Sequence, residues 1–335
     1  MSELTTIQDT GFVKYALNNG GSIHPLIIPA AQTKGTGLMN PSIYTNGNKL
    51  LVNIRHVNYT LYHSEGKMFQ HQFGPLQYLH PEDDRALRTV NYIATLSKSL
   101  EIEKIQRVDT STLDVKPMWE FTGLEDARLF NWEDKLYLCG VRRDTTTNGI
   151  GRMELSELVI TNDSIKEISR FRIPAPGANA SYCEKNWMPV LHKPYHFVKW
   201  SNPTEVVRVD MKAQTCTSIV VNDHRTLPLP ADLRGSSQIM PWGDTNLGIT
   251  HEVNLFNSEL GRKDGTYRHR FVLWDKEWNI YKVSPIFSFM TGEIEFCAGA
   301  TKMGDDLVIS FGFQDNAAYL LRAPIKIINK FIEMN

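Results

Sequence analysis

The chain has few cysteines and no pattern that would hold a metal ion or a disulfide framework. Its four cysteines are widely scattered along 335 residues, with no CxxC pair and no histidine at metal-ligand spacing. Two of them, Cys139 and Cys297, fall in apolar runs, where a small buried thiol is the usual arrangement. We therefore expect no structural zinc and no disulfide, and a reduced compartment.

The chain also has no excess of positive or negative charge and no long apolar run. The 36 basic and 37 acidic side chains give a net charge of -1, which offers no whole-chain footprint for nucleic acid or an anionic membrane. The segment MSELTTIQDTGF has no basic start followed by an apolar core, so no signal peptide is expected there, and no apolar run approaches the ~18 residues that cross a bilayer. We expect a cytoplasmic protein with no membrane partner.

Nucleotide-binding loops and long helices are absent as well. No glycine-rich loop follows a strand and opens a helix, so neither a Rossmann nor a P-loop site is expected, and we predict no cofactor. Helical periodicity is weak almost everywhere. The segment 80–90, HPEDDRALRTV, is the one convincing helix start, because acidic residues occupy its first turn.

What the chain does contain is a repeat: an apolar run, a polar turn and a second apolar run. The copies occupy 42–55, 127–142, 188–200, 239–252 and 300–313. A second pair of runs follows each copy, which is typical of two hairpins. Two hairpins make a four-stranded sheet, so the pattern predicts an all-β, five-bladed β-propeller over 37–335, with 1–36 as an N-terminal extension that packs on it or closes the ring. A β-sandwich is the alternative.

The most informative local string is Glu125-Asp126-Ala127-Arg128, which stands directly before an apolar strand. Alternation along a strand would put Asp126 and Arg128 on one face and Glu125 on the other. Two neighbouring acids beside a guanidinium can have their proton affinities pushed apart, which suits acid–base chemistry on a sugar oxygen. A salt bridge between blades is the alternative reading of the same string.

The string resembles the Glu-Asp-Pro-Arg motif of glycoside hydrolase family 130 and the related glycosyltransferase family 108, with Ala127 in place of the proline. Asn40-Pro41 and the segment 185–189, KNWMP, add to the resemblance. These families are five-bladed propellers that include mannoside phosphorylases, hydrolases and mannosyltransferases. The resemblance implies that Asp126 is the general acid, and that cations hold phosphate. Arg142, Arg143, Lys185 and His251 are possible counterparts of those cations.

Other polar residues recur at matching places in the repeat. Arg55, Arg142 and His251 end second strands, so their side chains are expected near one central axis. Trp187 offers a flat apolar face to a sugar ring, or else fills the space between blades. The substrate-binding candidates are Asn40, Arg55, Asn58, Arg128, Arg142, Arg143, Lys185, Asn186, Trp187, Gln238, His251, Glu252, Glu295 and Asp315.

These candidates predict a carbohydrate-active enzyme that transfers a glycosyl unit, with Asp126 and Glu125 as catalytic residues. The cations beside the carboxylates favour a phosphorylase or glycosyltransferase, whose co-substrate is phosphate or a nucleotide sugar. An inverting hydrolase would need a second carboxylate, and Glu252, Glu295 and Asp315 are candidates for it. A non-catalytic glycan-binding propeller is the rival from another class. An oligomer is compatible with the sequence.

Overall fold

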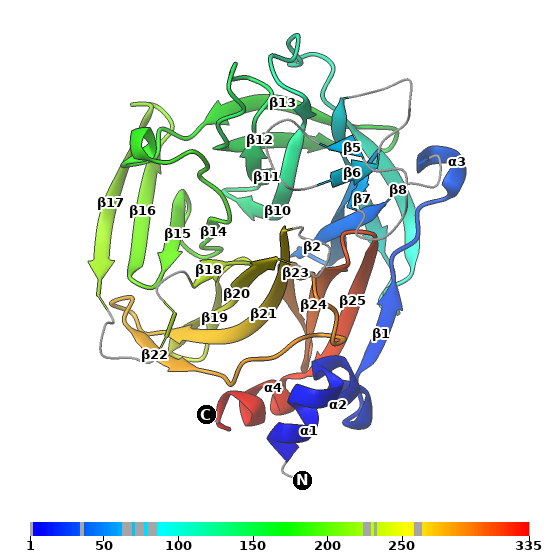
Figure 1. Cartoon of the computed structure of the whole chain (residues 1–335), viewed down its shortest axis with the longest axis vertical. Helices are drawn as coiled ribbons and strands as arrows, with labels where there is room; N and C mark the ends of the chain where they lie inside the picture. The colour runs from blue at the N-terminus through cyan, green and yellow to red at the C-terminus, as the bar shows by residue number, and fades with distance from the viewer. Residues whose placement is uncertain are drawn as a thin grey trace.

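The fold is all-β, with antiparallel strands arranged around a common centre (Figure 1). The computed structural model describes residues 3–33, 37–61, 69–70, 77–79, 86–223, 229–230, 233–257 and 263–334. Within these ranges the strands form successive four-stranded antiparallel units, and each repeated sequence segment supplies the first hairpin of one unit. The first strands of the units lie nearest the centre in Figure 1.

The first two units are joined edge to edge. Their strands are β2 (Leu38–Asn46), β3 (Lys49–Val57), β7 (Leu87–Leu96) and β8 (Ile102–Asp109), then β10 (Leu124–Trp132), β11 (Lys135–Arg142), β12 (Arg152–Ile160) and β13 (Ile165–Arg172). A short parallel pairing, in which Val108 faces Ile165, links β8 to β13. The two-residue strand β9 (Phe121–Thr122) runs parallel to β7. It leads directly into β10, so the Glu125-Asp126 string begins beside the first unit.

The next two units follow the same plan. The third contains β14 (Met188–Pro189), β15 (His196–Ser201), β16 (Thr204–Asp210) and β17 (Thr215–Asn222), after the 3-10 turn η1 (Ala178–Ala180). The fourth contains β18 (Arg234–Gly235), β19 (Met240–Trp242), β20 (Thr245–Asn257), β21 (Lys263–Trp274) and β22 (Ile280–Val283). Both β18 and β19 pair with β20, so two short strands share the innermost place of this unit.

The N-terminal segment completes the last unit. This unit contains β23 (Glu295–Met303), β24 (Asp306–Phe313), β25 (Ala317–Pro324) and, on the outside, β1 (Ser22–Pro25). Because β1 comes from the start of the chain, its pairing with β25 brings the two ends of the chain together. The boundary at residue 36 stays a prediction.

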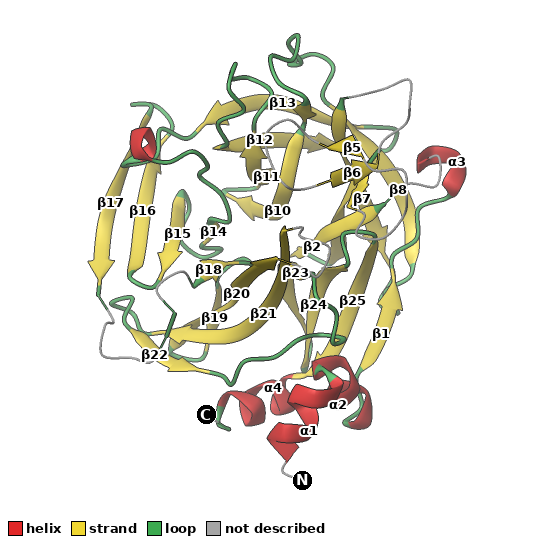
Figure 2. Cartoon of the chain, viewed as in Figure 1, coloured by secondary structure: helices red, strands yellow, loops and turns green. Residues whose placement is uncertain are grey.

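The helices lie outside the sheets (Figure 2). They are α1 (Glu3–Thr10), α2 (Phe12–Asn18), α3 (Ala30–Thr33) and α4 (Ile325–Ile332). Phe12 of α2 packs against Phe331 of α4 and Phe287, with ring centroids 5.1 and 5.0 Å apart. None of the helices in the described ranges has the length and apolar character needed to cross a bilayer.

The core lies between neighbouring sheets. Phe130 and Trp132 of the second unit pack in one cluster with Trp187 and Phe197 of the third. Strand β23 is buried along seven consecutive residues, whereas the outer strand β17 has no fully buried residue. Inner strands are therefore covered on both faces, as stacking of one sheet on the next requires.

Three short strands and one predicted helix lie next to segments of the chain that the structure does not describe. Strands β4 (Thr60–Leu61), β5 (Phe69–Gln70) and β6 (Gln77–Leu79) form a small separate sheet. The first part of the helix predicted over 80–90 lies outside the described residues, and its last part, from Leu87, belongs to strand β7. That end of the prediction is wrong, because Leu87 and Thr89 alternate inward with Arg88 outward, which is strand periodicity.

Candidate active site

The site is built on residues with a left-handed backbone at the start of three inner strands. Asn40, Asp126 and Asn186 have φ values of 47°, 49° and 64°. Strand pairing shifts register at the first two of these places, in β2 and in β10. Asparagine and aspartate tolerate this conformation better than other residues with a side chain, which explains their recurrence. Such bulges break the alternation of side chains and re-aim them.

Asp126 is held by one residue from each of two strands of the first unit. Asn40 donates from Nδ2 to Asp126 Oδ1 at 2.7 Å, and Arg55 donates from Nη1 to the same oxygen at 2.7 Å. Arg55 is itself fixed, because Nε donates to Thr89 Oγ1 at 3.2 Å and Nη2 donates to the Tyr59 hydroxyl at 2.9 Å. The side chain of Arg55 is 5% exposed, so water screens its interaction with Asp126 only weakly.

Glu125 faces the same guanidinium, which corrects the prediction from alternation. Its Oε2 lies 3.8 Å from Arg55 Nη2, and its Oε1 lies 3.4 Å from Arg143 Nε. Arg128 forms no ion pair with the Asp126 carboxylate. It donates instead to the backbone oxygens of Asp126 and Ser236, both at 2.8 Å. The physical reason is the bulge between Glu125 and Arg128, which the spacing of residues in the sequence does not reveal.

The two neighbouring carboxyls have opposite proton affinities. Burial would raise the pKa of Asp126, but Arg55, the hydrogen bond from Asn40 and Arg128 outweigh it and hold that pKa below the usual range. Burial raises the pKa of Glu125 above the usual range, although Arg55 and Arg143 oppose it. Asp126 is therefore the group that stays ionised, and Glu125 is the one that keeps a proton more readily.

Positive side chains surround this pair. Arg143 contacts Glu125 and also donates to the Gly149 carbonyl at 3.0 Å. Lys185 is exposed and acts electrostatically on both Glu125 and Asp126. Asn186 accepts from Arg128 Nη2 at 3.4 Å, so it orients that arginine. The sequence prediction of cations beside the acids thus agrees with the placement of Arg143 and Lys185.

A third carboxyl group, that of Asp315, and the tyrosine Tyr267 also belong to this region. Asp315 lies in the turn between β24 and β25, with a φ of 48°. Burial would lower the pKa of Arg55, but Tyr59, Asp126, Glu125 and Asp315 outweigh it and raise that pKa. Burial, Asp315 and Asp126 raise the pKa of Tyr267 to about 12. Asp315 and Asp126 therefore act on the same two groups from different sheets.

His251 lies beside this region but inside the protein. It is 1% exposed, its Nδ1 is 2.9 Å from the Ser236 hydroxyl, and its ring stacks on Tyr267 with centroids 5.9 Å apart. Burial, His269 and Lys185 lower the pKa of His251 well below its usual value. A neutral, buried imidazole is not a phosphate-binding cation, so that expected role of His251 does not fit.

Arg142 points away from the carboxyl pair. Its Nε lies 2.7 Å from Glu154 Oε2 and its Nη1 lies 3.4 Å from Asp144 Oδ2. Adjacent side chains on a strand face opposite ways, so only one of Arg142 and Arg143 reaches Glu125. The sequence indicated that at most one would point inward, and Arg143 is that one.

Gln238 connects neighbouring sheets through hydrogen bonds, whereas the sequence predicted that it contacts substrate. It is fully buried, and its Nε2 donates to the Leu129 carbonyl at 2.7 Å and to the Ile43 carbonyl at 3.1 Å. Its Oε1 accepts from the Ala300 amide at 3.1 Å. These partners belong to β10, β2 and β23, so one side chain of the fourth unit is hydrogen-bonded to three other units.

Trp187 is also structural in this arrangement. Its side chain is 1% exposed in the core between the second and third units, and its Nε1 donates to Glu184 Oε2 at 3.3 Å. A ring that is enclosed in this way has no free face for a sugar. The alternative reading of Trp187, as a filler between sheets, fits its position.

Three further candidates are bound to the protein itself. Asn58 donates to the Ala86 carbonyl at 2.9 Å and accepts from the Arg88 amide at 2.7 Å, so it links the end of β3 to the start of β7. Glu252 forms an ion pair with Arg270. The carboxylate of Glu295 is fully buried and accepts hydrogen bonds from the backbone amides of three residues, Phe289, Met290 and Gly292. Their polar atoms are therefore already used.

Sequence reasoning did not single out Arg234, Tyr59 or Tyr267. Arg234 lies on β18, opposite His251, and its buried Nε has no hydrogen-bond partner among the described residues. Tyr59 is the fourth residue after Arg55, but this spacing does not indicate a contact between the two side chains in a sequence read as strands. The described residues contain no group of three His, Cys, Asp or Glu side chains that could hold a metal ion.

Comparison with known proteins gives matches in structure but not in sequence. No protein-family model matches the chain, and no curated protein matches it in sequence. The β-1,2-mannobiose phosphorylase from Listeria innocua, solved with β-1,2-mannobiose, has a TM-score of 0.55 at 14% identity and covers 93% of this chain and 97% of its own.

Two proteins from Leishmania mexicana are similar as well. The GDP-Man-dependent mannosyltransferase MPT-1 has a TM-score of 0.50 at 11% identity, with 90% of each chain covered. The mannose phosphorylase MPT-4, solved with a phosphate ion, has a TM-score of 0.50 at 11% identity and covers 94% of this chain and 93% of its own. The chain therefore shares its fold with mannoside phosphorylases of glycoside hydrolase family 130 and with a mannosyltransferase, over almost its whole length.

Proposed function

We propose that the chain is a carbohydrate-active enzyme that transfers a mannose-like unit between an anionic leaving group and a sugar hydroxyl. The observation that carries the proposal is the Asp126 carboxylate, which Asn40 and Arg55 hold in its ionised form beside Glu125. An ionised carboxylate can take the proton from an attacking hydroxyl. In the reverse direction, with phosphate as the nucleophile, it would return that proton to the departing sugar oxygen.

The cations around the carboxylates favour an anionic co-substrate. Arg143 lies 3.4 Å from Glu125, and Lys185 acts electrostatically on both Glu125 and Asp126. Charge-assisted contacts to phosphate oxygens are among the strong hydrogen bonds. This supports a glycoside phosphorylase or a glycosyltransferase, with phosphate or a nucleotide sugar as the co-substrate. Similarity to a phosphorylase and to a mannosyltransferase at 11–14% identity agrees with both choices.

We also propose that the four-stranded units are the blades of a five-bladed propeller. The support is the ladder pattern, in which four antiparallel strands recur and β1 closes the last unit. In such an array the first strands meet at the axis. The shared contacts of Gln238 with β2, β10 and β23 fit that arrangement. A cytoplasmic location and an oligomer stay predictions.

An inverting hydrolase is the second candidate, and Asp315 is the observation that favours it. Of the three carboxylates predicted as a hydrolytic base, Asp315 is the one that acts electrostatically on the same groups as Asp126, namely Arg55 and Tyr267. Inversion with water needs two carboxyls roughly 6.5–9.5 Å apart. Asp315→Asn would abolish hydrolysis but leave phosphorolysis largely intact.

The test is product detection with two substrate pairs. The protein would be incubated with β-1,2-mannobiose and phosphate, and separately with GDP-mannose and mannose. We expect mannose 1-phosphate from the first pair or a disaccharide from the second, and at least a ~100-fold loss of rate in Asp126→Asn. Unchanged turnover in Asp126→Asn would remove Asp126 from the mechanism. Binding of sugars without any product would favour a glycan-binding protein.

A further inference from the structure

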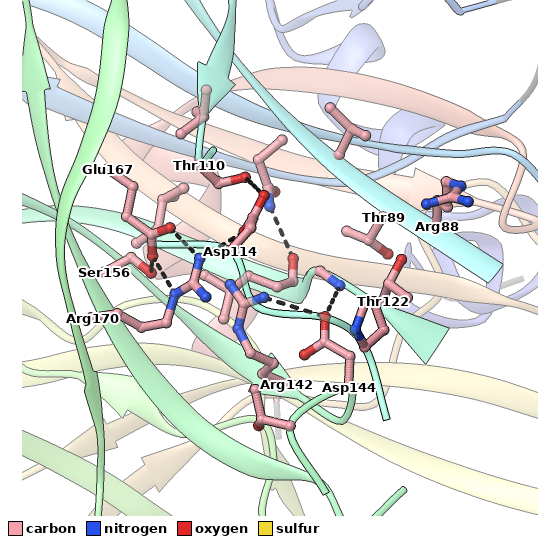
Figure 3. A pocket seen from close by; sticks show the side chains of 18 of the residues that line it. Arg88, Thr89, Thr110, Asp114, Thr122, Arg142, Asp144, Ser156, Glu167 and Arg170 are labelled. Atoms are coloured by element: carbon pink, nitrogen blue, oxygen red, sulfur yellow. Dashed lines mark hydrogen bonds and ion pairs between the residues drawn. The ribbon is translucent and has the colours of Figure 1, made fainter. Parts of the chain in front are cut away.

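A partly open cavity lies between the first two units, next to the residues of the candidate active site. It is a cavity of about 280 Å³, lined by residues of β7, β8, β11, β12 and β13 and by the segment 110–117 (Figure 3). Thr89 lines it, and the Thr89 hydroxyl also accepts the hydrogen bond from Arg55 Nε at 3.2 Å. One side chain therefore separates this cavity from the arginine that holds Asp126.

Two of the arginines that line the cavity, Arg142 and Arg170, are paired with carboxylates within the protein. Arg170 is paired with Glu167 at 2.5 Å and with Asp114 at 3.1 Å. Arg142 is paired with Glu154 at 2.7 Å and with Asp144 at 3.4 Å. Because carboxylates already neutralise both of these arginines, they offer little free charge to an anion, whereas Arg88 and Arg107, which also line the cavity, are exposed to solvent.

Two buried oxygen atoms in the wall of the cavity have no hydrogen-bond donor among the described residues. Asp144 is 8% exposed, and its Oδ2 accepts from the Gly123 amide at 2.8 Å and from Arg142. The other oxygen, Oδ1, is buried and has no hydrogen-bond partner among the described residues, and in Figure 3 it carries no dashed line. The Thr145 hydroxyl, also in the wall, is in the same state. A buried acceptor without a donor is unfavourable, so a ligand that brings hydroxyl donors would stabilise this wall.

We propose that this cavity is a second carbohydrate site, which takes one neutral sugar ring with Asp144 as an acceptor for its hydroxyls. A volume of about 280 Å³ is close to the lower end of the roughly 300–1,000 Å³ seen for small-molecule pockets, which suits a single ring. Leu124 and Leu158 provide apolar wall for the carbon-bound hydrogens. The proposal does not depend on the proposed function, because binding in this cavity requires no turnover.

The test uses calorimetric titration of the full chain with D-mannose, and with inorganic phosphate as the anionic comparison. Val115 lines the cavity and is 61% exposed, so Val115→Trp fills the mouth without removing a described hydrogen bond. Met118 lies in the same loop, is 51% exposed and does not line the cavity, so Met118→Trp is the matched control. We expect Val115→Trp to lose one mannose-binding event that Met118→Trp and Asp126→Asn both retain.

Crystals soaked in mannose give the second measurement. A sugar ring within hydrogen-bond distance of Asp144 is the expected result, and Asp144→Asn should weaken that binding event at least several-fold. Ordered water alone beside Asp144, equal mannose binding by the two tryptophan variants, or a preference for phosphate over mannose would each overturn the proposal. Failure of these tests leaves the role of Asp126 untouched, because Asp126 does not line the cavity.

Discussion

Asn40 Nδ2 and Asp126 Oδ1 lie 2.7 Å apart, and both residues have a left-handed backbone at the start of their strands. The two strands, β2 and β10, belong to different units, so the contact joins two copies of one repeated structural position. In one copy the position holds an amide and in the other a carboxylate. The amide acts as a donor that favours the charged form of the carboxylate.

Replacement of Asn40 with glycine tests this relationship. Glycine keeps the left-handed backbone at φ 47° but removes the donor, so the pKa of Asp126 should rise. If Asp126 works as an ionised base, the acid limb of the pH–rate profile of kcat/KM moves to higher pH in Asn40→Gly. The measurement is that profile, recorded for the wild type and the variant under the same ionic strength.

Asn186→Gly is the matched control for Asn40→Gly. Asn186 has a similar backbone, at φ 64°, but its side chain contacts Arg128 rather than Asp126. We expect its acid limb to stay with that of the wild type. Equal shifts in both variants would mean that loss of rigidity, and not loss of the donor, caused the change.

Glu125→Gln separates the two neighbouring acids. Because burial raises the pKa of Glu125, its charged form is disfavoured in the fold, and stability from this residue is present at low pH and lost as pH rises. Gln mimics the protonated form. Relative to the wild type, Glu125→Gln should therefore gain stability as pH rises above about 4.3, the value for an unfolded Glu. Urea unfolding at several pH values measures this, and a constant difference across pH would contradict it.

The hairpins and their order could be predicted from the sequence, because polar turns between apolar runs have a direct physical meaning. Antiparallel pairing in β2–β3, β10–β11 and β23–β24 follows the predicted segments. Alternation also indicated correctly that Arg142 and Arg143 face opposite ways. These features depend on neighbours in the chain, and the sequence contains that information.

The faces of Glu125 and Asp126 could not be predicted in the same way. A left-handed residue within a strand shifts the register by local backbone geometry, and aspartate is only one of several residues that adopt it. The role of Gln238 could not be predicted from the sequence for a different reason. Its four hydrogen bonds reach β2, β10 and β23, so its role depends on which strands meet at the centre.

Gln238→Leu should therefore destabilise the fold rather than alter substrate affinity. The change leaves the Ala300 amide and the Leu129 and Ile43 carbonyls without their buried partner, and each such group costs about 1–3 kcal/mol. We expect the free energy of unfolding to fall by at least ~2 kcal/mol. Gln106→Leu, on the outer strand β8, is the control, and equal losses would contradict a special role for Gln238.

Lys185→Ala tests whether the exposed cation serves an anionic co-substrate. Lys185 acts electrostatically on Glu125 and Asp126 while remaining exposed, so an anion bound there would contact a solvated charge. Exposed ion pairs contribute up to ~1 kcal/mol, which corresponds to a rise of up to about five-fold in KM for phosphate or the sugar nucleotide. Lys166→Ala, on the outer strand β13, should change nothing. An unchanged KM in Lys185→Ala would place the anion elsewhere.

Acid sensitivity of the fold should depend on His269. Burial and Arg268 lower the pKa of His269 to about 3, whereas an unfolded histidine titrates near 6.5. The unfolded chain binds the proton first, so stability from this residue is present above about pH 6.5 and is lost as pH falls towards about 3. His269→Gln keeps an acceptor for the Cys297 amide but cannot titrate. Its unfolding free energy should therefore fall less steeply between pH 6 and 4, by ~1.4 kcal/mol for each pH unit, in urea titrations. The same slope in both proteins would show that His269 is not the group that takes up the proton.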